Sequence, residues 1–155
     1  MADIRETEVA ALADHLGFWL RQASNHVSQA FARKLAGAGV GLTEWVLMRR
    51  LYGEAPQAPS RLAEAMGFTR GAVTNLADRL IERGLVARTA DPLDGRAQRL
   101  ALTARGRRLT LKLAALADQN DGECFGWLSD RDRRTLRKIL EETIARLALK
   151  TPPVD

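Results

Sequence analysis

Cysteine is nearly absent from this sequence, since Cys124 is its only copy in 155 residues, and aromatic residues make up just 5%. One cysteine excludes an intramolecular disulfide and a metal cluster held by several thiolates. The apolar runs are shorter than the ~18 residues needed to span a bilayer. The N-terminal text MADIRETEVA is too polar for a signal peptide. We therefore expect a single-domain cytoplasmic protein, residues 1–155.

Motifs of catalysis and of cofactor binding are also missing. His15 and His26 stand eleven residues apart, with no nucleophile beside either. There is no HExxH pair for zinc, no GxxxxGK[ST] loop for phosphate and no CxxC pair. We expect a protein that is not an enzyme and that uses neither a cofactor nor a metal.

Positive charge, by contrast, is concentrated in one segment. Residues 69–108 contain nine arginines and four acids, which equals the net charge of +5 of the whole chain. The remaining residues carry equal numbers of basic and acidic side chains. A charge confined to one segment indicates a polyanionic partner, and we expect double-stranded DNA.

Apolar residues spaced by three and four predict long helices near both ends of the chain. The first is expected from about residue 8 to 35, and the glycines of residues 36–41 end it. Thr43 is expected to cap a second helix. Another helix is expected to run from Thr103 to about residues 121–122, and a last one to begin at Ser129, where Asp132 completes a capping box.

The basic segment has a different pattern. A short helix over about 60–66 and a turn at Gly67 precede a helix over 69–83, which Gly84 ends. Two strands, 85–89 and 99–103, follow, joined by ADPLDGRAQ. This order predicts a winged helix-turn-helix within a mainly α (α+β) fold, with the second helix in the major groove.

The exposed face of that helix supplies hydrogen-bond donors. We expect Arg70, Thr74 and Asn75 to read bases, because they lie early in the helix, and Arg79 to contact phosphate. Arg83 is either a phosphate contact or part of a solvated face. The complete predicted DNA-binding set is Ser60, Thr69, Arg70, Thr74, Asn75, Arg79, Asp94, Arg96 and Arg99.

The wing, about residues 85–103, is expected to probe the minor groove with Arg96, while Arg99 holds a phosphate at its base. Acids at a tip that faces DNA need an explanation. Either an Asp orients the arginine through a charge-assisted hydrogen bond, or the Asp94-Gly95 pair only forms the turn.

These features together resemble the MarR family of bacterial transcriptional regulators. The matching text is LTEWVLMRRLY, then PSRLAEAMGFTRGAVTNLADRLIERGLVART, then DPLDGRAQRLALTARG, roughly residues 42–106. The Asp94–Arg96 pair and the L-T-x-x-G end match the family's wing pattern. Many members carry an acid after the wing arginine, where this chain has Ala97.

The resemblance implies a homodimer built from residues 1–37 and 104–150, around a DNA-binding lobe of residues 42–103. It implies a regulator that binds a palindromic operator, usually as a repressor, and that a small aromatic or phenolic effector releases. The effector would bind where the outer helices meet the lobe. We expect His15, Trp19, Trp45 and Arg49 to line that site, or the tryptophans to be core residues instead.

Two alternatives remain open from the sequence. The chain can be a redox-sensing regulator that acts through Cys124, although Cys124 also fits a buried small hydrophobe. A winged helix can also be a protein-interaction module, but such a module would expose apolar anchors on the helix that carries Arg70 and Asn75.

Overall fold

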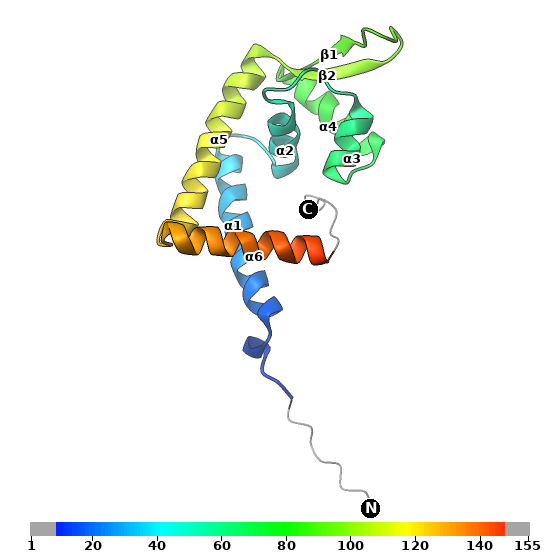
Figure 1. Ribbon diagram of the computed structural model, residues 1–155. Helices are drawn as coiled ribbons and strands as arrows, with labels where there is room; N and C mark the ends of the chain where they lie inside the picture. The colour runs from blue at the N-terminus through cyan, green and yellow to red at the C-terminus, as the bar shows by residue number, and fades with distance from the viewer. Residues whose placement is uncertain (1–8, 148–155) are drawn as a thin grey trace, which may run out of the picture.

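The computed structural model describes residues 9–147 (Figure 1). The expected helix start at residue 8, the end of the last helix at residues 148–150 and the tail 151–155 lie outside the described residues. Within them the chain forms six α-helices and a two-stranded antiparallel sheet, which confirms the mainly α class. The elements are η1 (Leu12–Asp14, a 3-10 helix), α1 (Leu16–Gly37), α2 (Leu42–Leu51), α3 (Pro59–Met66), α4 (Arg70–Glu82), β1 (Val86–Ala90), β2 (Gln98–Leu102), α5 (Ala104–Phe125) and α6 (Asp130–Arg146).

The hydrophobic core lies in the middle of the chain, between α2, α3, α4 and the sheet. The end of α1 and one turn of α5 close it with Leu35 and Leu113, which are fully buried. Burial of this kind stabilises by roughly 1.5–3 kcal/mol for each large aliphatic side chain. The other fully buried side chains are Leu47, Met48, Leu62, Met66, Val73, Leu80, Val86, Leu100 and Thr110.

Helix α4 forms as its sequence predicts. The Thr69 hydroxyl accepts a hydrogen bond from the Ala72 amide at 3.1 Å and so caps the first turn. Val73, Leu76, Ala77 and Leu80 are buried at helical spacing. The helix stops at Gly84, whose φ of +68° only glycine adopts without strain. One face of α4 is therefore fixed to the core, and the opposite face is left to solvent.

The first long helix is shorter than predicted. Helix α1 begins at Leu16, after η1 and an extended His15. The Asp14 carboxylate accepts from the Ala11 amide at 2.9 Å, and the Trp19 indole donates to the Ala13 carbonyl at 2.8 Å. These local hydrogen bonds compete with helical pairing, so a continuous helix from residue 8 is wrong over residues 9–15.

Three predicted element boundaries also need correction. Gly41 rather than Thr43 precedes α2, because the Glu44 carboxylate accepts from the Gly41 amide at 2.9 Å. Helix α5 continues past residues 121–122 to Phe125, since Gly122 stays helical, at a cost of about 1 kcal/mol relative to alanine. Both strands shift by one residue, and Thr103, as predicted, caps α5 by accepting from the Gly106 amide at 3.0 Å.

The linker before α3 adds a short third edge to the sheet. Gln57 exchanges two backbone hydrogen bonds with Leu100, at 2.9 and 2.8 Å. A single residue carries too little alternation to be predicted as a strand. Its consequence is that the start of α3 is fixed against β2, and so against the base of the wing.

A polar cluster joins α1 to α5. The Lys34 ammonium contacts the Glu123 carboxylate at 2.6 Å and the Asn120 side-chain oxygen at 3.2 Å. The buried Asn120 amide also donates to the Val27 carbonyl at 3.2 Å. Hydrogen bonds from Lys34 and then Gln119 lower the pKa of Glu123, so this carboxylate remains ionised.

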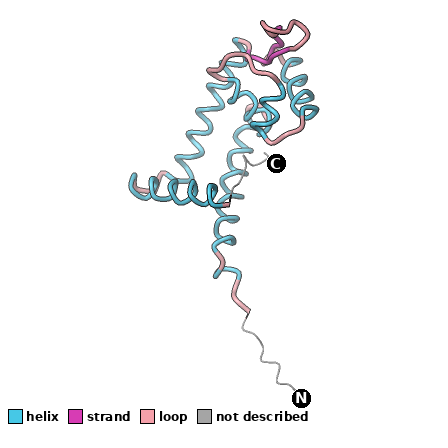
Figure 2. The backbone as a smooth tube through the Cα atoms, turned by 45° about the vertical axis from the view of Figure 1, so that its right-hand side comes forward, coloured by secondary structure: helices cyan, strands magenta, loops and turns pink. Residues whose placement is uncertain are grey.

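The outer helices expose large apolar side chains. The N-terminal half of α1 projects away from the rest of the molecule, and α6 turns sharply off the end of α5 (Figure 2). None of the residues of α6 is buried. Among residues 9–147 no helix has the length and apolar character needed to cross a bilayer. The exposed side chains are Leu12, Leu16, Trp19, Leu20, Trp127, Leu136, Ile139, Leu140, Ile144 and Leu147.

Candidate nucleic-acid interface

The outer face of α4 presents the four predicted polar residues together. Arg70, Thr74, Asn75 and Arg79 are all exposed, on the side of the helix opposite its buried residues. The Thr74 hydroxyl donates to the Arg70 carbonyl at 2.9 Å, which leaves its oxygen and methyl group for an outside partner. Since this face carries no large apolar side chain, its chemistry favours a polar, anionic partner over a protein surface.

The beginnings of α3 and α4 hold the other two predicted residues. Ser60 is the second residue of α3 and is half-buried, whereas Thr69 caps α4 and stays exposed. Helix N-termini carry unpaired backbone amides and a partial positive charge, so both positions suit a phosphate oxygen.

An ion pair that the sequence did not indicate links α4 to the sheet. Asp78 on α4 pairs with the Arg88 guanidinium on β1. This pairing neutralises an acid beside the exposed face of α4, and it holds Arg88 next to the helix. The outward position of Arg88 on its strand is the only signal in the sequence, because the pair depends on how α4 crosses the sheet.

The arginine that an aspartate orients is Arg99, not Arg96. The Asp91 carboxylate accepts from the Arg99 Nε at 2.8 Å and from the Leu93 amide at 2.8 Å. Asp94 accepts from the Arg96 backbone amide at 3.0 Å, so it forms the turn, as the second of our alternatives had it. Sequence proximity favoured the wrong partner, since Asp91 and Arg99 meet only when the hairpin closes.

The pKa of Asp91 is lowered, mainly by the Leu93 amide and then by Arg99, which both favour the ionised carboxylate. The base of the wing is therefore held by a fixed negative charge. Arg96, by contrast, lies on the exposed tip, and its guanidinium makes no hydrogen bond or ion pair with another residue of the range 9–147.

Arg83 has a structural role. Its guanidinium contacts the Glu44 carboxylate at 3.2 Å and the Gly39 carbonyl at 2.9 Å. It therefore ties the end of α4 to the start of α2 and to the turn before it. Of our two interpretations of Arg83, neither a phosphate contact nor a solvated face describes this arrangement.

The four predicted effector residues do not form one pocket within a chain. Trp45 packs edge-to-face on Phe31, with ring centroids 5.9 Å apart, beside the core. Trp19 is 57% exposed and lies twelve residues before Phe31, which is about 18 Å along α1. His15 lies beside Trp19 at the start of that helix, and Arg49 is exposed near the Tyr52 ring, at 6.0 Å from its centroid.

Cys124 lies in the last turn of α5 rather than between two helices, and it is half-buried. It lines a hollow with His26, Val27, Phe125 and Trp127. Its pKa shows no feature of an activated thiolate that a charged neighbour would produce, since Glu123 is the one ionised group adjoining it in the chain.

Comparison with known proteins places this geometry in a family. The MarR family model matches residues 41–97, which hold α2, α3, α4 and most of the wing. The crystal structure of a probable transcriptional regulator from Pseudomonas aeruginosa is 32% identical. It has a TM-score of 0.72 and covers 86% of this chain and 100% of its own. The chain belongs to the MarR family.

Other MarR relatives span the same length. CouR from Rhodococcus jostii RHA1, solved with p-coumaroyl-CoA bound, is 30% identical, with a TM-score of 0.75 over 87% of this chain and 95% of its own. The HTH-type transcriptional repressor Mb2911 of Mycobacterium bovis is 28% identical over 82% of this chain and 91% of its own. This MarR protein is thus a DNA-binding transcriptional regulator and not an enzyme. Helix α4 is its recognition helix, and the hairpin of β1 and β2 is its wing.

Proposed function

We propose that this MarR protein is a homodimeric repressor that binds a palindromic operator and leaves it when a phenolic effector binds. The observation that carries the proposal is the division of its surface. Polar donors cover the outer face of α4, whereas large exposed apolar side chains are confined mainly to α1 and α6. The relative Mb2911 is named a repressor, which favours repression.

The homodimer is supported by the exposed apolar side chains of the outer helices. Contiguous apolar patches on a monomer mark interaction sites, and a second copy of the chain offers matching surfaces. Two-fold symmetry then places two recognition helices about one helical turn, ~10 bp, apart on DNA. The operator half-sites would be inverted repeats at that spacing.

Within each half-site the contacts divide by position. Arg70, Thr74 and Asn75 would read base edges in the major groove. Ser60, Thr69 and Arg79 would contact phosphates around it. Arg96 would enter the minor groove on a turn shaped by Asp94, and Arg99 would hold a phosphate from the base of the wing.

The effector would bind between α2 and α5, close to the lobe. A cavity of about 90 Å³ lies there, lined by Arg49, Tyr52, Thr110, Leu111 and Ala114. The CouR structure contains a phenolic thioester, which supports the phenolic class. This cavity is too small for such a ligand unless it opens, and His15 and Trp19 would reach it only from a second subunit, while Trp45 supports it from the core.

Substitution of the recognition helix tests the DNA-binding assignment. Arg70→Ala and Asn75→Ala should each weaken binding to the operator by about 1–3 kcal/mol, with little effect on unrelated DNA. Footprinting upstream of the protein's own gene defines the operator, and gel-shift titration measures affinity. Arg134→Ala, an exposed change on α6, is the matched control. Equal losses on operator and unrelated DNA would contradict base reading by α4.

A further inference from the structure

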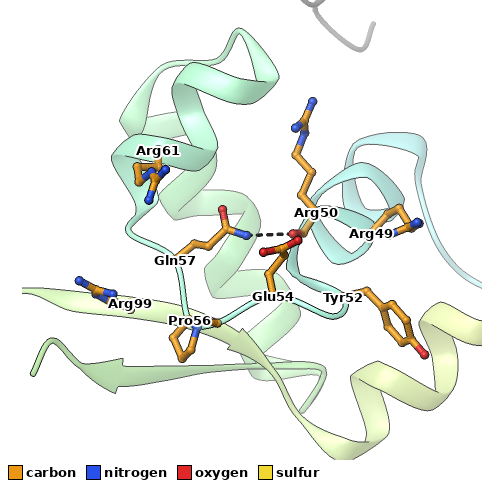
Figure 3. Close-up of a pocket in the computed structure, with 9 residues that line it drawn as sticks. Arg49, Arg50, Tyr52, Glu54, Pro56, Gln57, Arg61 and Arg99 are labelled. Carbon is orange, nitrogen blue, oxygen red and sulfur yellow. Dashed lines mark hydrogen bonds between the residues drawn. The ribbon is translucent and has the colours of Figure 1, made fainter.

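A groove rich in arginine lies beside the wing, outside the exposed face of α4. We call it the arginine groove (Figure 3). Its volume is about 520 Å³, and it is bounded by the end of α2, the linker to α3, the start of α3 and β2. Four of its side chains are guanidinium groups and only Glu54 is acidic. The lining residues are Arg49, Arg50, Tyr52, Glu54, Ala55, Pro56, Gln57, Arg61 and Arg99.

The floor of the groove is rigid. Gln57 is tied to Leu100 through both backbone groups, and its side-chain amide donates to the Arg50 carbonyl at 2.9 Å (Figure 3). Arg61 and Arg99 lie on one side of Gln57 in this view, and Tyr52 lies on the other. The groups that bound the groove are thus positioned before any ligand arrives.

Several donors in the groove lack a partner. The Nε of Arg50 is buried and makes no hydrogen bond to any described residue, although buried donors in proteins are nearly always paired. Arg61 is exposed and forms no ion pair within residues 9–147. Arg99 uses only its Nε on Asp91, so its two terminal amino groups remain available. Guanidinium groups bind phosphate through paired N–H bonds.

We propose that the arginine groove binds a phosphate group, with Arg61 and Arg99 as its principal ligands. This inference rests on the proposed function, because it adds a phosphate site to a DNA-binding regulator. The phosphate can come from the DNA backbone beside the wing or from a phosphate-bearing small molecule. The second source has a continuous path to the cavity between α2 and α5, since Arg49 and Tyr52 line both.

Arg61→Gln tests the site, with Arg134→Gln as a control that removes the same charge from α6. In the DNA arm, the affinity of full-length protein for its operator is measured against salt concentration. A backbone contact predicts a slope smaller by about 0.9 for Arg61→Gln than for wild type and control. In the small-molecule arm, inorganic pyrophosphate should raise the melting temperature of wild type and control, but not of Arg61→Gln.

A change in the first arm assigns the phosphate to DNA, and a change in the second assigns it to a free ligand. The proposal is overturned if Arg61→Gln behaves like Arg134→Gln in both arms. Wild-type protein that fails to bind its upstream DNA would contradict the proposed function alone, because the pyrophosphate arm needs no DNA. Circular dichroism of both variants confirms that they fold.

Discussion

At the scale of single residues, the acids near the DNA-binding surface organise their surroundings rather than oppose DNA. Asp78 pairs with Arg88, Asp91 holds Arg99, and Asp94 shapes the turn before Arg96. Each acid is thereby neutralised or satisfied locally. The net positive field of residues 69–108 remains, while the arginines gain fixed positions.

Arg96→Ala tests the tip of the wing. Because Arg96 has no partner within the described residues, its loss should leave folding unchanged and weaken binding to all DNA sequences. A cation in the minor groove also contributes to counterion release, so the salt dependence of binding should become less steep. Gel-shift titration at several salt concentrations measures both effects. Normal operator affinity of Arg96→Ala at physiological salt would contradict a wing contact.

Asp91→Asn tests the base of the wing. The substitution retains an oxygen for the Leu93 amide and removes the charge that holds Arg99, so hydrogen exchange of the Ala97 and Arg99 amides should accelerate. Asp94→Asn, which keeps its own turn, is the control. In wild type the stabilisation is present above the ordinary pKa of 3.8 and is lost as pH falls through the lower folded value. Wing exchange protection should therefore persist unchanged from pH 7 to pH 5.

At the scale of elements, the wing and α5 form one unit. The Thr103 amide donates to the Leu85 carbonyl at 3.1 Å, and its hydroxyl donates to the Gly84 carbonyl at 2.7 Å. A Cβ on Gly106 would lie 2.0 Å from the Leu85 oxygen. The first turn of α5 can approach the wing this closely only because residue 106 is glycine.

Gly106→Ala should therefore destabilise the protein by about 1–3 kcal/mol, as overpacking does in other cores. Gly122→Ala in the same helix is the control, because a Cβ there meets nothing within 4 Å. The control should be neutral or stabilising by up to about 1 kcal/mol, from its better helix propensity. Urea unfolding measures both. A Gly106→Ala variant as stable as wild type would show that the α5–wing approach relaxes at no cost.

The sequence predicted those elements whose patterns are local. The periodic apolar residues of α4, its Thr69 cap and the Ser129 cap of α6 are all present as predicted. It did not predict the Asp91–Arg99 pair, the Gln57–Leu100 bridge or the role of Arg83. Each of these joins residues that only the tertiary fold brings together, so spacing along the chain carries no sign of them.

At the scale of the whole molecule, burial is unevenly distributed. The core lies between Leu35 and Leu113, while α6 and the first half of α1 bury nothing of their own. A helix packed on so little gains its stability from a partner surface, since most helical stability comes from packing of an apolar face. The outer helices therefore require an association for which the lobe has no need.

Ile144→Asp tests this association. A charge placed among the exposed apolar residues of α6 should shift the protein from dimer to monomer at micromolar concentration in analytical ultracentrifugation, and operator binding should weaken with it. Lys138→Asp, on the polar side of α6, is the control and should remain dimeric. A wild-type protein that sediments as a monomer, or an Ile144→Asp variant that remains a dimer, would contradict dimerisation through α6.

The close approach at Gly106 also makes α5 a lever arm. The helix has 22 residues and so extends about 33 Å from the wing to the corner with α6. A tilt of about 5° over that length displaces one end by about 3 Å. Because the wing cannot slide on the first turn of α5, a small rearrangement at the far corner would be delivered to Arg96 and Arg99 as a translation comparable to the length of a hydrogen bond.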